Sequence, residues 1–363
     1  MKDAKENTTT VKTAAMAVIA ALIMVTSVYA GDLEPSAPPA AGGTMKTLDE
    51  VEPRIPIHAD DLPMTITESG SYYFTESIEY AAGNTPITIE ANDVTVDLMG
   101  YTLKGPDSGY SYGIKLSECS NVEVRNGTVR DFYRGITTYS TGSDHRIINI
   151  RAVSNTVYGI YLATAGCMVK DCTASGNGNI GIYTGIGCTV KSNTAYDNGN
   201  SGIYVDDGCT VQNNTAYGND NYGIHTGSGC TVKSNTAYDN TSLGISTGSG
   251  CTVNSNTAYD NTGFGIYTSS GCTVQNNTAY ANDNYGIHTG ESCTVTGNTS
   301  RANTSQGGIW VDDKSTIIGN TATDNTGWGL YCSQNCLVDQ NTAVDNTNNM
   351  YSYNCTVGTN HAP

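Results

Sequence analysis

The sequence predicts an all-β protein, a single-stranded, right-handed parallel β-helix with about 21 residues per coil and roughly a dozen coils. Three observations support this fold: cysteine recurs at a fixed interval, apolar and polar residues alternate after each cysteine, and asparagine recurs at two fixed positions. A period of roughly 20–50 residues indicates a solenoid, because a single repeat cannot bury its apolar face alone.

Cysteine marks the period of the repeat. The cysteines that follow one another at intervals of 21 residues are Cys167, Cys188, Cys209, Cys230, Cys251, Cys272 and Cys293. Equivalent side chains on stacked strands lie about 4.8 Å apart and point the same way, so they do not face each other as a disulfide requires. We expect a ladder of buried free thiols, with disulfides as the alternative. Cys332 and Cys336, which depart from the main spacing, are the pair best suited to a bridge.

Each repeat predicts three short strands, counted from its cysteine as position 0. The cysteine and the valine at +2 face inward on the first strand, because strand side chains alternate. Alanine at +7 faces inward on the second strand, and isoleucine at +15 on the third. This small, largely β-branched set suits a narrow interior. Leucine-rich repeats need a leucine interior and hexapeptide coils repeat in sixes, so the right-handed β-helix remains.

Asparagine occupies two further columns, at +5 and +10 from the cysteine. Asparagine tolerates the left-handed backbone region, and its amide can bond the backbone or the next asparagine along the stack. We expect both columns to be structural turn ladders and not binding residues.

The chain is predicted to begin with export and lead-in segments. A basic start, an apolar run from Ala14 to Val25 and a small-residue cleavage site at Ala30 are typical of a secretory signal peptide. We expect an exported protein, extracellular, at the cell surface or periplasmic, without a membrane span after cleavage; an uncleaved signal acting as an anchor is the alternative. The predicted segments are a signal peptide (1–30), a Pro/Ala/Gly-rich linker (31–60), an N-terminal cap (61–84), the β-helix (85–357) and a tail (358–363).

The charge is strongly negative, with a formal net value of −17. An acidic protein repels phosphate backbones, which argues against nucleic acid as a partner. Positive charge is concentrated in one stretch, where five arginines fall within 27 residues: Arg125, Arg130, Arg134, Arg146 and Arg151.

The coil motifs G-I-Y-T and G-C-T-V-x-x-N-T-A-Y-x-N resemble the right-handed parallel β-helix repeats of carbohydrate-binding proteins and sugar hydrolases, including the periplasmic NosD-like group. The resemblance covers roughly Thr85 to Val357. It implies the fold and a polysaccharide or cell-surface glycan as partner. Enzymes of this kind place their catalytic residues case by case, so the resemblance implies no catalytic residue here.

An outward aromatic column lies at +16, beside the inward isoleucine. The chain has 24 Tyr against 3 Phe, the balance expected when rings are exposed and need a polar tip. Rings on a rigid flat face suit stacking on pyranose rings; the alternative is that they stack on one another and stabilise the coils. The predicted carbohydrate-binding residues are Tyr161, Tyr183, Tyr204, Tyr267, Trp310 and Tyr331.

The arginine-rich coils are the candidate catalytic region. Acid/base chemistry on an anionic polysaccharide needs a cation to neutralise the uronate and a nearby group to move a proton. Asp131, Arg134, Asp144, His145 and Arg146 supply both types of group. The alternative is structural, since His145 aligns with the cysteine position and Asp131 with the +10 asparagine column.

Two acidic pairs are candidates for weak Ca²⁺ binding together with turn carbonyls: Asp206-Asp207 and Asp312-Asp313. Solvated acidic turns are the alternative, and we expect no other metal or cofactor.

The leading hypothesis is an exported β-helix protein that binds carbohydrate or serves as an elongated surface element without strong catalysis. The near-constant coil length motivates it, because few loops are left to wall a deep active site. The competing hypothesis is a polysaccharide lyase, glycoside hydrolase or uronate epimerase acting at the arginine-rich coils.

Overall fold

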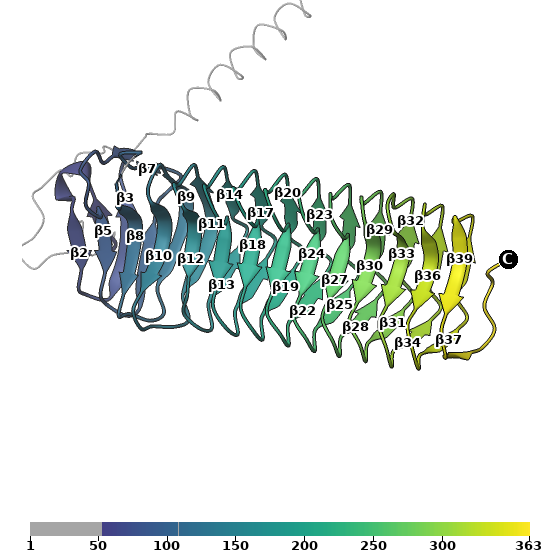
Figure 1. Ribbon diagram of the computed structural model, residues 1–363. Coiled ribbons are helices and arrows are strands. Elements are labelled where there is room, and N and C mark those ends of the chain that lie inside the picture. The colour runs from purple at the N-terminus through teal and green to yellow at the C-terminus, as the bar shows by residue number, and fades with distance from the viewer. Residues whose placement is uncertain (1–52, 108) are drawn as a thin grey trace, which may run out of the picture. The chain divides into compact units, whose positions relative to one another are not determined.

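The chain winds into a parallel β-helix, as the sequence predicts (Figure 1). The computed structural model describes residues 53–107 and 109–363. The predicted signal peptide and most of the predicted linker lie outside the described residues. Within residues 54–363, which form one compact unit, a 14-stranded sheet contributes one strand to each coil and a 26-stranded sheet covers the opposite side. Among the described residues, no helix has the length and apolarity needed to cross a membrane.

The 14-stranded sheet corresponds to the third predicted strand of each repeat. Its strands are β2 (Met64–Ile66), β5 (Ile87–Ile89), β8 (Tyr112–Ser117), β10 (Arg134–Tyr139), β12 (Tyr158–Leu162), β15 (Ile182–Thr184), β18 (Ile203–Val205), β21 (Ile224–Thr226), β24 (Ile245–Thr247), β27 (Ile266–Thr268), β30 (Tyr285–Thr289), β33 (Gly307–Val311), β36 (Trp328–Cys332) and β39 (Asn348–Ser352).

The 26-stranded sheet corresponds to the first two predicted strands, which form two adjacent columns. The first column holds β1 (Ile55–Ile57), β3 (Gly70–Phe74), β6 (Val94–Asp97), β13 (Met168–Lys170), β16 (Thr189–Lys191), β19 (Thr210–Gln212), β22 (Thr231–Lys233), β25 (Thr252–Asn254), β28 (Thr273–Gln275), β31 (Thr294–Thr296), β34 (Thr316–Ile318), β37 (Leu337–Asp339) and β40 (Thr356–Val357). The second holds β4 (Ile78–Glu79), β7 (Thr102–Lys104), β14 (Thr173–Ser175), β17 (Thr194–Tyr196), β20 (Thr215–Tyr217), β23 (Thr236–Tyr238), β26 (Thr257–Tyr259), β29 (Thr278–Tyr280), β32 (Thr299–Arg301), β35 (Thr321–Thr323) and β38 (Thr342–Val344). Two long strands, β9 (Glu123–Arg130) and β11 (Arg146–Val153), span both columns.

The first coils start earlier than predicted. Residues 61–84, predicted as a cap, carry β2, β3 and β4, which pair in register with β5, β6 and β7 of the next coil. A single 3-10 turn, η1 (Ala59–Asp61), and strand β1 precede them. The 14-stranded sheet therefore counts 14 coils where the sequence predicts roughly a dozen.

The interior is built from the predicted small apolar residues. Val190, Ala195 and Ile203 are fully buried, and each pairs with the identical residue 21 positions later. Side chains therefore stack in columns of like residues, which gives a continuous core along the coils.

Both asparagine columns form buried hydrogen-bond ladders, as predicted. The Asn214 amide Nδ2 donates to Oδ1 of Asn235 in the next coil at 3.0 Å and to the Val190 carbonyl at 2.9 Å. The second ladder repeats this geometry, with Nδ2 of Asn198 donating to Oδ1 of Asn219 at 2.9 Å. These amides satisfy strand carbonyls beside the turns that would otherwise be buried without partners.

The twelve cysteines are all free thiols, and Cys332 and Cys336 form no bridge. In the repeat array, the backbone N–H of Cys188 donates to Sγ of Cys209 at 3.2 Å, and that Sγ donates to the carbonyl of Gly185. The thiols thus fill space and join adjacent coils through weak hydrogen bonds.

Alkylation of the native protein is expected to label Cys355 first, because it alone among the twelve is partly exposed. The buried thiols should react only after unfolding, and burial raises the pKa of Cys172 to about 12, which further removes the reactive thiolate. Timed iodoacetamide labelling with peptide mass spectrometry measures this order. Uniform labelling of all twelve cysteines in the native state would contradict the buried arrangement.

Candidate functional site

The outer face of β9 and β11 carries most of the predicted arginine cluster. Because strand side chains alternate, Val124 and Ile147 point into the core while Glu123, Arg125 and Arg146 face outward. β11 lies directly beside β9 in register, with Arg146 opposite Glu123. Oppositely charged side chains of consecutive coils are therefore neighbours.

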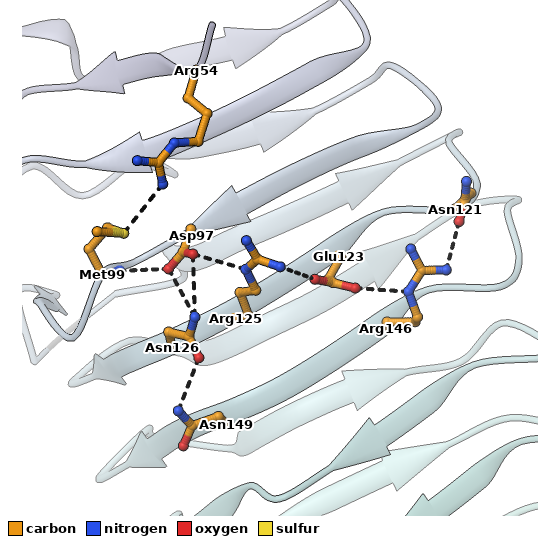
Figure 2. A network of polar contacts seen from close by, with 9 residues as sticks. All are labelled: Arg54, Asp97, Met99, Asn121, Glu123, Arg125, Asn126, Arg146 and Asn149. Carbon is orange, nitrogen blue, oxygen red and sulfur yellow. Dashed lines mark hydrogen bonds and ion pairs between the residues drawn. The ribbon is translucent and has the colours of Figure 1, made fainter. Parts of the chain in front are cut away.

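These residues form a charge network that alternates in sign (Figure 2). Asp97, at the end of β6, is buried and accepts a hydrogen bond from Nε of Arg125 at 2.9 Å. Arg125 also pairs with Glu123 at 3.0 Å, and Glu123 pairs with Nε of Arg146 at 2.9 Å. Beyond Arg146, Oδ1 of Asn121 accepts from Nη1 of Arg146, and Nδ2 of Asn121 donates to Oδ1 of Asp93. Each of these arginines is thus already neutralised by a carboxylate.

An amide chain runs from the same aspartate towards a surface notch. Nδ2 of Asn126 donates to Oδ1 of Asp97 at 3.2 Å, and Nδ2 of Asn149 donates to Oδ1 of Asn126 at 3.0 Å (Figure 2). Both asparagines occupy the left-handed backbone region, at φ of 58° and 52°. Their amides are therefore held in fixed positions by the turn between the two columns of the sheet.

The notch has a volume of about 200 Å³ and is lined by Gly100, Asn126, Gly127, Asn149 and Arg151. Gly127 is required here, since a Cβ at this position would lie 2.3 Å from Cβ of Leu98. Nε of Arg151 donates to Oγ1 of Thr128 at 2.9 Å. Among the described residues, no carboxylate lies within 4.0 Å of this guanidinium. The notch therefore combines two oriented amides with a cation that lacks an ion-pair partner.

A second hollow of about 370 Å³ lies beside β7 and includes Glu79, Lys104 and Asp131 in its lining. Its cation is already paired, since Nζ of Lys104 lies 2.6 Å from Oε1 of Glu79, and Asp131 is paired with Nε of Arg130 at 2.8 Å. Asp107 adds a further carboxylate to the lining, so the described residues of this hollow offer an anion no unpaired cation.

The structure does not bring the five predicted catalytic residues together. Asp131 and Arg134 lie at the start of β10, whereas Asp144, His145 and Arg146 follow its other end. The six residues of β10 separate the two groups by roughly 17 Å at the usual rise per residue. One proton-transfer site cannot include both groups.

The structural alternative holds for His145 and needs correction for Asp131. His145 is buried at the cysteine position, where its Nδ1 accepts from the N–H of Val122 at 3.4 Å. Burial lowers the pKa of His145 to about 4, so the ring is neutral near pH 7. Asp131 lies one residue before the position that aligns with the asparagine column. Phe132 occupies that position, and its N–H donates to Oδ1 of Asn155 in the next coil at 3.2 Å.

Asp97, Asn126, Asn149 and Arg151 were not predicted as one site, although Arg151 belongs to the noted arginine cluster. Their signal in the sequence is a departure from the repeat. Position +5, where later coils place the inward asparagine, is Gly127 in β9. A glycine at an inward ladder position indicates close approach, and here the buried Leu98 takes the space that a side chain would need.

The predicted aromatic column lies on the outer face of the 14-stranded sheet. Tyr161 stacks on Tyr183 with ring centroids 4.8 Å apart and an interplanar angle of 16°, and Trp310 stacks on Tyr331 at 3.8 Å and 12°. Neighbouring rings thus cover much of each other's faces, as expected if they stabilise adjacent coils. Sugar binding by Tyr161, Tyr183, Tyr204, Tyr267, Trp310 and Tyr331 stays a prediction.

The two acidic pairs lie in separate turns, where each carboxylate accepts a hydrogen bond. Asp206 accepts from the Tyr183 hydroxyl and Asp207 from the N–H of Ser228. Asp312 accepts from Nε1 of Trp310 and Asp313 from the N–H of Gln334. In the part of the chain that the structure describes, no group of three or more His, Cys, Asp or Glu side chains is arranged to hold a metal ion. Calcium binding stays an untested prediction.

Comparison with known proteins identifies the repeat. A family model described as the right handed beta helix region matches residues 80–241 and 226–300. Similar solved structures include the A-modules of two mannuronan C-5 epimerases from Azotobacter vinelandii. The AlgE4 module is 18% identical, with 80% of this chain and 91% of that chain covered and a TM-score of 0.54. The AlgE6 module is 17% identical, with 82% of this chain and 91% of that chain covered and a TM-score of 0.52. A mutant of the periplasmic alginate epimerase AlgG is similar at 14% identity, covering 81% of this chain and 85% of that chain, with a TM-score of 0.53. No curated protein sequence matches. At these identities the structural likeness shows the fold.

Proposed function

Because this chain belongs to the right handed beta helix region family, we propose that it binds an acidic polysaccharide on the outer face of its arginine-rich coils. The observation that carries the proposal is the notch at Arg151, where a guanidinium with no ion-pair partner among the described residues lies beside two fixed asparagine amides. The proposal includes export, which is supported by the sequence of residues 1–30.

The chemistry of the notch suits a uronic acid residue. A guanidinium binds a carboxylate through two parallel N–H donors, which gives both charge and geometric selection. An asparagine amide both donates and accepts, so it suits sugar hydroxyls. The similar β-helix structures support this class of ligand, since their names specify epimerases of mannuronan and alginate.

The surrounding face suits a polymer more than a small molecule. Two further cations lie in the neighbouring strand column on the next two coils, where Lys170 on β13 is in register with Lys191 on β16. Lys170 is paired with Asp171 at 3.0 Å, whereas the structure gives Lys191 no carboxylate within 4.0 Å among the described residues. Since coils repeat at about 4.8 Å, cations recur along the face at intervals that a glycan chain can follow.

We propose binding without strong catalysis. The residues that line the notch include no histidine and no carboxylate. The nearest acid in the network, Asp97, has both oxygens engaged, Oδ1 by the N–H of Met99 and Oδ2 by Arg125. A lyase or epimerase needs a group free to take a proton from the sugar, so the enzyme hypothesis is the second choice.

Arg151→Gln is expected to weaken binding of an oligouronate about tenfold or more, because it removes a charge-assisted bidentate contact. Arg301→Gln is the matched control: it removes one positive charge from the same sheet several coils away. Affinity gel electrophoresis with polygalacturonate, alginate and neutral dextran measures the effect, with a parallel search for new unsaturated or reducing ends.

Equal losses in the two variants would show only long-range charge attraction and would contradict a site at the notch. If no polysaccharide retards the wild-type protein, the proposed function is wrong. New chain ends that disappear in Arg151→Gln would favour the enzyme hypothesis instead.

A further inference from the structure

Arg134 is a partly buried cation on the other sheet. Within the part of the chain that the structure describes, its only hydrogen bond is a long one, from Nη1 to Oγ1 of Thr137 at 3.4 Å. Its Nε is buried without a hydrogen-bond partner. No carboxylate lies within 4.0 Å of it among the described residues, in contrast to Arg125 and Arg146. A guanidinium has five N–H donors, so most of its donors are not used within the protein.

Tyrosine rings surround this guanidinium. Its central carbon lies 4.3 Å from the ring centroid of Tyr161, 5.1 Å from Tyr158, 5.8 Å from Tyr112 and 5.9 Å from Tyr133. The register explains the arrangement, because Tyr112 on β8 and Tyr158 on β12 both pair with Arg134 on β10. Arg134 thus lies at the N-terminal end of the aromatic column.

The tyrosine shell stabilises the cation, and outside the buried Nε it leaves most of the Nη donors unused. Cation–π contacts contribute about 0.5–2 kcal/mol and act through the ring faces, so they satisfy no N–H group. Burial has already removed part of the water around the guanidinium, which lowers the further desolvation cost when an anion binds. The planar fork of N–H donors matches a carboxylate.

We infer that Arg134 and its four tyrosines form a second anion site, which binds the carboxylate of an acidic sugar. The ligand group is assigned as a carboxylate because of the guanidinium and its unused donors. That the carboxylate belongs to a sugar rests on the proposed function. β10 belongs to the 14-stranded sheet and the notch to the 26-stranded sheet, so the two sites lie on different faces. One chain therefore has two separate carboxylate sites.

Titration calorimetry with trigalacturonate tests this inference through the stoichiometry. The wild-type chain is expected to bind two molecules, and Arg134→Gln and Arg151→Gln one each. Arg134→Lys keeps the charge but loses the fork, so it should retain the second site with about three- to tenfold weaker affinity. Arg301→Gln is the matched control, since Arg301 also lies over a tyrosine ring, 4.7 Å from Tyr280, at a distant coil. The fully methyl-esterified trisaccharide should bind neither site.

The outcomes separate the two sites. Loss of one molecule in Arg151→Gln with no change in Arg134→Gln would overturn the Arg134 site and leave the notch intact. A single wild-type site that disappears in Arg134→Gln would support the Arg134 site and reject the notch. Equal binding of the methyl ester would overturn the carboxylate assignment. Thermal unfolding of each variant shows whether a lost site reflects a misfolded chain, and Arg134→Lys then serves as the decisive variant.

Discussion

Replacing Asn219 by alanine is expected to lower the free energy of unfolding by about 3–6 kcal/mol, because four buried hydrogen bonds are lost. The Asn219 amide donates to the Ala195 carbonyl at 3.2 Å and to Oδ1 of Asn240 at 2.9 Å. Its own Oδ1 accepts from the N–H and the Nδ2 of Asn198, at 3.2 Å and 2.9 Å. Water cannot replace these partners, since Asn219 is fully buried.

Urea unfolding followed by circular dichroism measures this loss, and hydrogen exchange shows where it acts. Exchange should accelerate in the coils next to Asn219, because each coil of a solenoid contacts only its neighbours. Asn254→Ala is the matched control, since the Asn254 side chain lies on the outer face of β25 and, among the described residues, only accepts from the adjacent Ser255 hydroxyl. A comparable loss in the control would mean that the ladder does not hold the coils together.

Gly223→Ala is expected to cost about 2–4 kcal/mol, through overlap between coils. An added Cβ would lie 2.7 Å from the carbonyl oxygen of Gly244 and 2.7 Å from Nδ2 of Asn240. Neither atom can move freely, because the first belongs to the next coil's backbone and the second to the asparagine ladder. The substitution would therefore disturb strand stacking and the ladder together.

Gly229→Asn provides the control for the glycine prediction. Gly229 has a φ of +66° with open space around it, and asparagine tolerates this region of the backbone. We expect a change within about 1 kcal/mol in urea unfolding. If Gly223→Ala and Gly229→Asn unfold at the same urea concentration, close contact between coils is not the reason why position 223 requires glycine.

The repeat made the fold predictable from particular residues. Because identical residues recur every 21 positions, the inward set Val190, Ala195 and Ile203 could be assigned from alternation alone. The asparagine ladders followed for the same reason, since only a stacked register places like amides next to each other. The start of the coils was harder to predict, because β2, β3 and β4 lack the cysteine and asparagine markers.

The candidate site was predicted only in part. Sequence clustering pointed to the arginine-rich coils, yet Asp131 and Arg134 lie at one end of β10 and Asp144, His145 and Arg146 beyond the other. Closeness in sequence does not mean closeness in space here, because the two groups are about half a coil apart and lie at opposite ends of β10. Residues one or two coils apart, such as Asp97, Arg125 and Asn149, meet instead.

The sequence by itself determined the parallel β-helix, its period, its inward residues and its ladders, because a repeated local pattern specifies its own stacking. Only the tertiary structure decided which charges neutralise each other. Arg125 and Arg146 are paired across coils, whereas Arg151 and Arg134 have no carboxylate within 4.0 Å among the described residues. Pairing depends on distances of a few ångströms between side chains of different coils, and in the irregular N-terminal coils no repeat fixes those distances.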